Sequence, residues 1–215
     1  MAAESTPSRV ALLAGSTGLI GRALLPLLLA SPRYTQVHAL LRRPALAEQA
    51  KLQVHVVDFQ ALPSLPPVDD VFITLGTTIK VAGSQAAFRQ VDFDAVVNTA
   101  RAAKAAGATR LAVVSALGAD ANSRVFYNRV KGEMQNAVGA LGYSSVVIVQ
   151  PSLLLGDRST LGQPVRPGEV WGGRLLSWLP KSVRPIADTQ VAQALLRALA
   201  DPKPGVTVLR SGDLY

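Results

Sequence analysis

Cysteine is absent from the 215 residues of this chain, and histidine and long apolar runs are scarce. Without cysteine the chain has no disulfides, no thiolate nucleophile and no cysteine-ligated metal. The two histidines, His38 and His55, lie in apolar segments of the kind that form strands, which argues against a histidine-rich metal site or a Ser-His-Asp triad. The most apolar tract, 24–30, is far shorter than the roughly 20 residues that span a membrane. The N-terminal MAAESTPSR also lacks the layout of a signal peptide, so we expect a soluble protein in the cytoplasm.

The net charge of the chain gives a weak indication of what it binds. The formal net charge is +8, and a positive surplus favours anionic ligands. The basic residues are scattered, however, with no run longer than Arg42-Arg43, and aromatic residues make up only 5% of the chain. Proteins that bind single-stranded nucleic acid stack the bases on aromatic side chains. We therefore expect a small-molecule ligand and no nucleic acid.

Short apolar runs rich in Val, Leu and Ile alternate with longer helical patterns along the chain. Such runs are typical of parallel strands covered on both faces, and the alternation indicates right-handed βαβ units. We predict a single α/β domain over 1–215, with a doubly wound, mainly parallel Rossmann sheet. The predicted strands are Val10–Ala14, Gln36–Leu41, Val54–Val57, Val71–Leu75, Leu111–Ser115, Ser145–Val149 and Val206–Leu209. The predicted helices are Leu19–Ala30, Gln85–Ala106, Arg124–Leu141 and Asp188–Ala200.

Residues 153–186 interrupt this rhythm and concentrate glycine, proline, arginine and both tryptophans. We expect this variable segment to form the substrate side of the domain. Its arginines, among them Arg158, suit an acidic or phosphorylated substrate, although exposed loop arginines are common. Trp171 and Trp178 could form one apolar stripe that packs this segment against the domain. Alternatively they could contact a second subunit, in which case the protein would be a homodimer.

The junction between the first predicted strand and helix reads GSTGLIG. Glycines let the backbone turn tightly and let a pyrophosphate approach its N–H groups, while the helix N-terminus adds partial positive charge. The spacing GxxGxxG differs from the GxGxxG of many dehydrogenases, and no Lys-Ser/Thr follows as in a Walker A loop. We interpret the junction as a dinucleotide cradle made by Gly15, Ser16, Thr17, Gly18, Leu19, Ile20 and Gly21.

The end of the second predicted strand indicates which dinucleotide the cradle binds. Sites that prefer NAD usually carry Asp or Glu about twenty residues after the cradle, where it bonds the ribose 2′-hydroxyl. Arg42 and Arg43 occupy that position here, and guanidinium groups suit a 2′-phosphate. We therefore predict NADP(H) as the cofactor, with NAD(H) less favoured. Asp58, at the end of the third predicted strand, is either a partner for the adenine amino group or an ordinary loop residue.

The sequence FYNRVKGEM places Tyr127 and Lys131 four residues apart, on one face of a predicted helix. A lysine ammonium near a tyrosine stabilises the phenolate, so the pair could exchange a proton with a substrate. The spacing alone is a weak motif. Tyr127 could equally be an interior aromatic residue, and Lys131 a solvated helix residue.

Several segments together resemble the short-chain dehydrogenase/reductase superfamily, most closely the Tat-interacting-protein-like group of its atypical members. They are the cradle, FITLGTT, VVSALGAD, FYNRVKGEM and IVQPSLLLGDR, and the resemblance extends over residues 8 to 210. It implies that Ser115, Tyr127 and Lys131 are catalytic, with Ser115 orienting the substrate oxygen. It further implies that the cofactor lies beside four other residues, with Gly76 and Thr77 at its ribose and Pro151 and Ser152 at its nicotinamide.

The chain departs from the family pattern at two positions. It reads Ser115-Ala116-Leu117 where many relatives have two or three serines, so Ser115 is either the catalytic or a structural serine. Asp92 stands where extended relatives often carry Asn, which puts a water relay in doubt. The resemblance implies an NADP(H)-dependent oxidoreductase for a small carbonyl or alcohol substrate. The alternatives are a regulatory dinucleotide-binding protein without turnover and, less favoured, a nucleotide-sugar epimerase or dehydratase.

Overall fold

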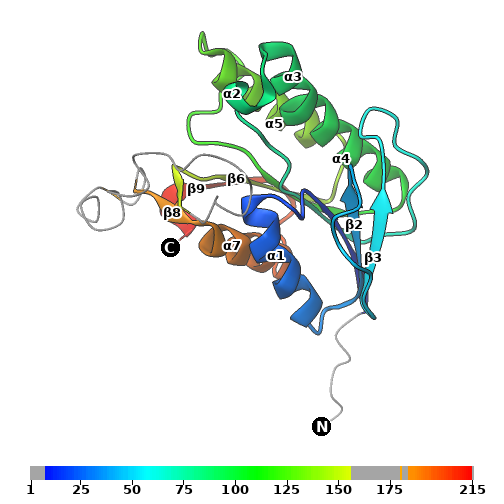
Figure 1. The fold of residues 1–215 in the computed structure, drawn as a ribbon. Helices are drawn as coiled ribbons and strands as arrows, with labels where there is room; N and C mark the ends of the chain where they lie inside the picture. Colours follow the sequence, from blue (N-terminus) through cyan, green and yellow to red (C-terminus); the bar gives the residue numbers. More distant parts are fainter. Residues whose placement is uncertain (1–7, 156–179, 181–183, 215) are drawn as a thin grey trace.

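A parallel sheet of seven strands forms the centre of the computed structural model, which describes residues 8–155, 180 and 184–214 (Figure 1). Its strand order is β3-β2-β1-β4-β5-β6-β9, and every neighbouring pair is parallel. This order confirms the predicted doubly wound Rossmann fold, because the chain progresses outward in both directions from β1. The strands are β1 (Arg9–Ala14), β2 (Tyr34–Leu41), β3 (Leu52–Val56), β4 (Asp70–Ile73), β5 (Arg110–Val114), β6 (Ser145–Gln150) and β9 (Gly205–Arg210).

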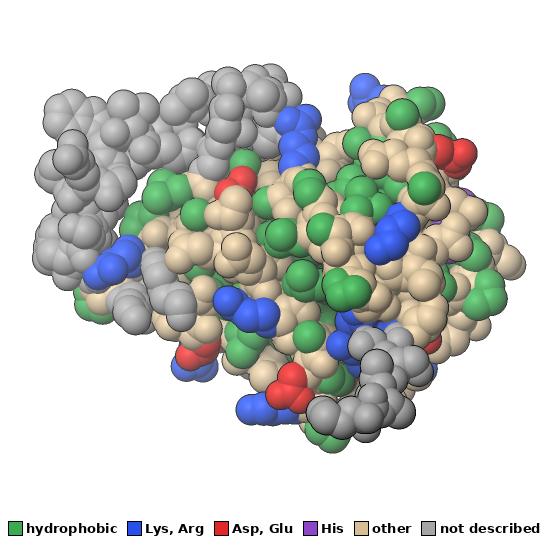
Figure 2. Space-filling view, turned by 90° about the horizontal axis from the view of Figure 1, so that it is seen from below, with side chains coloured by type: hydrophobic (Ala, Val, Ile, Leu, Met, Phe, Trp, Pro, Cys, Tyr) green, Lys and Arg blue, Asp and Glu red, His purple; other side chains and the backbone are tan. Residues whose placement is uncertain are grey.

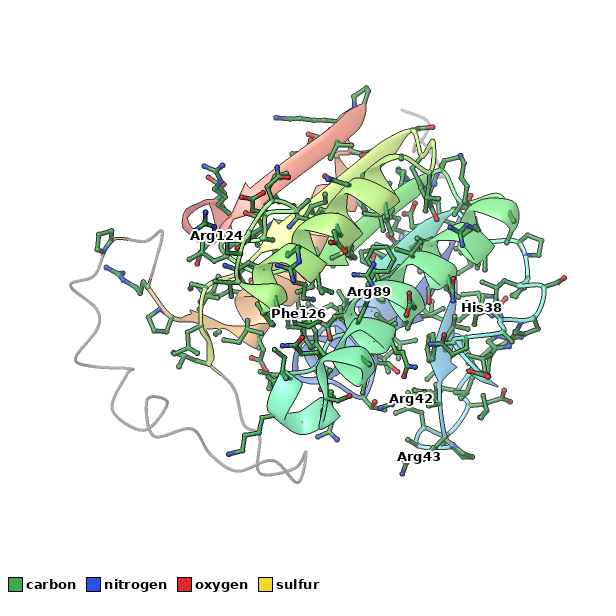
Figure 3. All side chains as sticks on the ribbon, turned by 90° about the horizontal axis from the view of Figure 1, so that it is seen from above. His38, Arg42, Arg43, Arg89, Arg124 and Phe126 are labelled. Carbon is green, nitrogen blue, oxygen red and sulfur yellow. The ribbon has the colours of Figure 1, made fainter. Side chains whose placement is uncertain are left out.

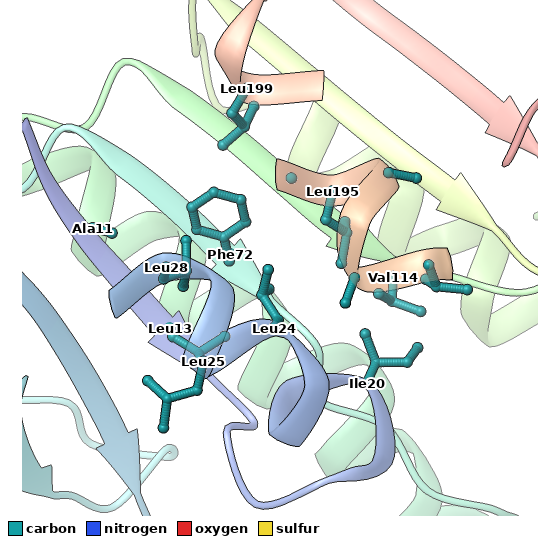
Figure 4. Packing of buried hydrophobic residues seen from close by; sticks show 14 of the residues in the cluster. Ala11, Leu13, Ile20, Leu24, Leu25, Leu28, Phe72, Val114, Leu195 and Leu199 are labelled. Carbon is teal, nitrogen blue, oxygen red and sulfur yellow. The ribbon is translucent and has the colours of Figure 1, made fainter. Parts of the chain in front are cut away.

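Helices cover both faces of the sheet (Figure 1). One face carries α1 (Leu19–Ala30) and α7 (Asp188–Ala200), and the opposite face carries α4 (Val96–Ala105) and α5 (Phe126–Gly139). On the α1 face, Leu24 and Leu28 pack with Phe72 of β4 and Leu195 of α7 in one buried cluster (Figure 4). A second apolar cluster fills the space between the sheet and the other helices. Because helices bury both faces of the sheet, most side chains on both sides of its central strands are apolar, and these strands are continuous apolar runs in the sequence.

The predicted helix Gln85–Ala106 is wrong as a single element. The structure has α3 (Gln85–Arg89), then the π-helical turn Gln90–Ala95, and then α4. A shorter helix that we did not predict, α2 (Ile79–Ala82), precedes them. A π-turn inserts an extra residue into the helical repeat and changes which side chains face the sheet; such turns are frequent at functional sites.

The carboxyl ends of three strands come earlier than predicted, at Val56, Ile73 and Val114. Differences of one or two residues are ordinary at element ends. Residues just beyond these ends, Asp58, Thr74 and Ser115 among them, lie in the loops that line the cavities described below.

Within the variable segment, the described residues form a small parallel pair, β7 (Leu154–Leu155) and β8 (Ile186–Ala187). The predictions for Arg158, Trp171 and Trp178 fall outside the described residues. The two histidines contact each other, with 2.9 Å between His38 Nδ1 and His55 Nε2. Burial and the nearby His55 lower the pKa of His38, which favours a neutral His38 in this contact between β2 and β3.

The described helices include none with the length and apolar character needed to cross a membrane. On the face carrying α1 and α7, Lys and Arg side chains are spread among apolar and polar ones and form no continuous basic patch (Figure 2). That distribution agrees with the scattered basic residues of the sequence.

Candidate functional site

Two adjoining cavities lie at the carboxyl ends of β1, β4 and β5, with volumes of about 960 and about 430 Å³. They meet where the chain order reverses between β1 and β4, the usual ligand position in this fold. Of the predicted site residues, Gly15, Thr17, Gly18, Arg42 and Asp58 line the larger cavity. The smaller cavity is lined by Leu19, Ile20, Ser115, Tyr127, Lys131, Pro151 and Ser152. Gly76 and Thr77 line both, whereas Ser16, Gly21 and Arg43 line neither.

Two glycines of the cradle, Gly15 and Gly21, are required by close contacts with the rest of the chain. Gly15 has φ +94°, and a Cβ there would lie 2.7 Å from Thr74 Oγ1. A Cβ on Gly21 would lie 2.0 Å from the Gly15 carbonyl oxygen, so no side chain fits where α1 passes this turn. The turn is closed by Gly18 N, which donates to the Gly15 oxygen at 3.0 Å. α1 begins without a side-chain cap, which leaves N–H groups of its first turn for a ligand.

The larger cavity contacts only one of the two predicted arginines. Both Arg42 and Arg43 are exposed beyond the end of β2 (Figure 3), but only Arg42 is among the lining residues. Asp58 lines the cavity while its Oδ1 accepts from Gln60 N at 2.9 Å, the geometry of a loop aspartate that turns its own backbone. The neighbouring Phe59 is also a lining residue, which the sequence analysis missed because it ends no predicted strand.

A buried ion pair lies at the wall of the smaller cavity. Lys131 Nζ is 2.7 Å from Asp92 Oδ1, and the side chains are 4% and 0% exposed. The other carboxylate oxygen of Asp92 accepts from Thr77 N at 2.8 Å. Asp92 reaches both partners from the π-helical turn Gln90–Ala95. Lys131 is therefore not a solvated residue, and the carboxylate fixes its ammonium beside Gly76, whose Cβ would lie 3.7 Å from Nζ.

Tyr127 lies one helical turn before Lys131 on α5 and is half-buried. Its ring packs against Phe88 of α3 with the centroids 5.2 Å apart, and Phe126 contacts Phe88 from the adjacent position. Further along α5, a Cβ on Gly132 would lie 2.1 Å from Ala121 N. This glycine lets the loop after β5 cross close over the helix, which brings the Ser115 and Tyr127 segments together at one cavity.

Ser115 is held by a glutamine that the sequence analysis missed. Gln135 Nε2 donates to Ser115 Oγ at 2.6 Å, and Gln150 Nε2 donates to Gln135 Oε1 at 3.2 Å. The Ser115 hydroxyl thus accepts from the protein and retains its own hydrogen for another partner. Tyr127, Lys131 and Gln135 follow at four-residue intervals on α5, and this periodicity was the available signal.

The Ser152 hydroxyl forms hydrogen bonds with groups that do not line the cavity. Its Oγ donates to the Arg184 carbonyl oxygen and accepts from Ser211 Oγ at 2.9 Å, so it joins the end of β6 to the C-terminal part of the domain. The neighbouring Pro151 carbonyl accepts from Leu117 N at 3.0 Å. Both residues line the smaller cavity, and their contact with a nicotinamide stays a prediction.

A family model described as NAD(P)H-binding matches residues 15–202. This chain belongs to that NAD(P)H-binding family. "Protein FMP52, mitochondrial" of Eremothecium gossypii is 35% identical over an alignment of 215 positions, gaps included, that covers 95% of each protein. "Protein fmp52, mitochondrial" of Emericella nidulans is 37% identical over an alignment of 167 positions that covers 73% of this chain and 70% of that one. These names contradict our expectation of a cytoplasmic protein.

Solved structures with similar folds include MoeE5 with UDP-glucose and NAD, at TM-score 0.70 and 19% identity over 93% of this chain and 75% of that one. The Bordetella bronchiseptica enzyme WbmH with NAD+ has TM-score 0.69 and 16% identity, over 95% and 76%. At this identity the likeness extends to the fold alone. The narrower Tat-interacting-protein-like grouping stays a prediction.

The cradle residues fit the dinucleotide expected of an NAD(P)H-binding family member. Ser16 is 1% exposed, and its hydroxyl has no partner among the described residues. A buried hydroxyl without a partner is costly unless a ligand bonds it. Together with the uncapped start of α1, it provides donors where a pyrophosphate would bind. Gly15 and Gly18 line the larger cavity and add no side chain to its wall.

Proposed function

We propose that this protein is an NADP(H)-dependent oxidoreductase of the short-chain dehydrogenase/reductase type that acts on a small carbonyl or alcohol substrate. The observation that carries the proposal is the meeting of Ser115, Tyr127 and Lys131 at one cavity that adjoins the glycine cradle. These three residues come from the end of β5 and from α5. Only the fold brings the serine to the tyrosine–lysine pair.

Each side chain has a distinct task in carbonyl reduction. The dinucleotide supplies a hydride when bound. Ser115 donates its free hydrogen to the substrate oxygen and orients it, because Gln135 already occupies a lone pair of its hydroxyl. Tyr127 gives its proton to that oxygen as general acid and takes it back in the oxidation direction. Lys131, held by Asp92, places positive charge where the phenol oxygen becomes negative.

The choice of NADP(H) rests on Arg42. It lines the larger cavity near the end of β2, where a ribose 2′-phosphate would be recognised. We expect Arg42→Ala to weaken NADPH binding about tenfold by loss of a charge-assisted bond, with little change for NADH. Arg43→Ala is the matched control, since Arg43 does not line the cavity, and should have the smaller effect. Fluorescence titration of the wild type and the two variants with each cofactor measures these six affinities. Equal wild-type affinities for NADPH and NADH would refute the preference.

Turnover itself is tested by NADPH consumption against a panel of aldehydes, ketones and quinones. An oxidoreductase consumes NADPH with members of one carbonyl class. Cofactor binding without turnover across the whole panel would refute the enzyme proposal.

The second candidate is a regulatory protein that binds the dinucleotide without turnover. One observation favours it: Asp92 neutralises Lys131 by direct contact, which weakens the charge available to the phenol. The free Ser115 hydrogen and the placement of Tyr127 in the cavity favour the enzyme. The names of the FMP52 relatives also lead us to propose a mitochondrial location, which fractionation of cells expressing the tagged protein would test.

A further inference from the structure

The smaller cavity offers a substrate little charge. Asp92 and Lys131 are the only charged side chains among its described lining residues, and they neutralise each other at 2.7 Å. A phosphorylated or carboxylated substrate needs a free cationic partner at its binding site. The described walls of this cavity contain none.

Most polar side chains of the cavity are already bonded within the protein. Thr74 Oγ1 donates to the carbonyl oxygens of Ala14 and Gly15, and Thr78 Oγ1 accepts from Val81 N at 3.2 Å. The Ser152 hydroxyl bonds Arg184 and Ser211. Of these three hydroxyls only that of Thr78 keeps a hydrogen for a ligand, so the several hydroxyls of a sugar ring would find few partners here, which disfavours their binding. The hydroxyls of Ser115 and Tyr127 suffice for one carbonyl oxygen.

Exposed apolar side chains gather at this cavity. The described surface has seven large apolar side chains that are clearly exposed, and three of them line it. They are Val81 of α2, Leu117 after β5 and Leu153 after β6, with exposed fractions of 54%, 38% and 39%. Three separate segments thus present apolar groups to one opening. Exposed apolar side chains that cluster around a cavity mark a binding surface.

We propose that the substrate is an uncharged carbonyl compound with an apolar body, such as a straight-chain aldehyde or ketone. Its oxygen meets Ser115 and Tyr127, and its chain lies against Val81, Leu117 and Leu153. Reduction adds a hydride from NADPH to the carbonyl carbon and the Tyr127 proton to the oxygen, giving the alcohol and NADP+. This inference rests on the proposed oxidoreductase function and narrows its substrate.

The test compares straight-chain aldehydes of increasing length with NADPH as donor. Each added CH₂ that is buried is worth about 0.8 kcal/mol, so we expect kcat/KM to rise up to about fourfold per carbon from butanal to octanal. An eight-carbon aldehyde with a terminal carboxylate should be at least about tenfold poorer than octanal, because that charge finds no partner. A flat or falling length series, or preference for the carboxylate, would overturn the proposal.

A variant pair locates the effect. Leu153→Asp puts a charge at the opening, at a position that lines the smaller cavity alone, and should lower kcat/KM for octanal about tenfold and for butanal much less. Val206→Asp is the matched control, because Val206 is 53% exposed on β9 and is not among the lining residues. Equal losses for both aldehydes, or for both variants, would overturn the assignment of the apolar chain to this surface. If the wild type oxidises NADPH with none of the carbonyl compounds tested, the proposed oxidoreductase function is wrong, and the inference about its substrate is wrong with it.

Discussion

Asp70 and Asp92 are both fully buried carboxylates at opposite edges of the same sheet, and they have very different surroundings. Asp70 begins β4, at the amino edge. Its oxygens accept from Arg9 at 2.9 Å, from Arg110 at 2.6 and 3.1 Å, and from the Tyr34 hydroxyl at 2.8 Å. These partners are the first residues of β1, β5 and β2, so Asp70 ties together the starts of four adjacent strands.

Asp92 lies at the carboxyl edge, and its partners among the described residues are one ammonium and one backbone N–H. It lines a cavity, whereas Asp70 lines neither of the two cavities described above. A buried carboxylate must be compensated, and a structural one is compensated on all sides. Asp92 instead holds one side chain, Lys131, in place beside a space for ligands. The difference shows that burial of a charge alone does not distinguish a structural cluster from an ion pair at a cavity wall.

We expect substitution of Asp by Asn to lower the free energy of unfolding by different amounts at these two positions. Asp70→Asn removes the carboxylate from buried guanidinium groups and should lower the free energy of unfolding by about 3–5 kcal/mol. Asp92→Asn keeps an acceptor for Thr77 N but leaves one buried ammonium, that of Lys131, without its carboxylate, so its cost should be smaller, about 2–3 kcal/mol. Urea unfolding followed by circular dichroism measures both. Equal losses would show that the two carboxylates have the same structural role.

A smaller effect is expected at Gln135, which touches Ser115 and reaches the cavity only through it. Gln135→Met preserves size but removes the hydrogen bond, and should lower kcat about threefold to tenfold with cofactor affinity unchanged. Adding Gln135→Met to Ser115→Ala should have no further effect, because the hydroxyl that Gln135 positions is already gone. Independent, multiplying effects would assign Gln135 a purely structural role.

The strands of the main sheet and the glycine-rich turn after β1 could be predicted from the sequence. Apolar runs predicted the strands of the seven-stranded sheet to within one or two residues, because parallel strands are buried on both faces, whereas the short pair β7 and β8 was not predicted. The GSTGLIG turn could be predicted from the spacing of its glycines, although the contact that requires Gly15 comes from Thr74, after β4. The resemblance to a known family added Ser115, Tyr127 and Lys131, which the structure brings to one cavity.

The contacts between segments far apart in the sequence could not be predicted from the sequence. Asp92 meets Lys131 only because the π-helical turn rotates it inward, and apolar periodicity gave no sign of that turn. The bonds of Gln150 to Gln135 and of Arg110 to Asp70 depend on how separate elements are aligned in the sheet and its covering helices. One sequence gives no information on such alignments.

The most direct test of the account is the turnover of Tyr127→Phe relative to its cofactor affinity. The substitution removes one hydroxyl and keeps the ring that packs on Phe88. With an aldehyde that the wild type reduces, we expect NADPH oxidation to fall about 10²–10⁴-fold while the dissociation constant for NADPH stays within about twofold. Normal turnover by Tyr127→Phe would contradict the assignment of the proton donor and, with it, the catalytic role of this edge of the sheet.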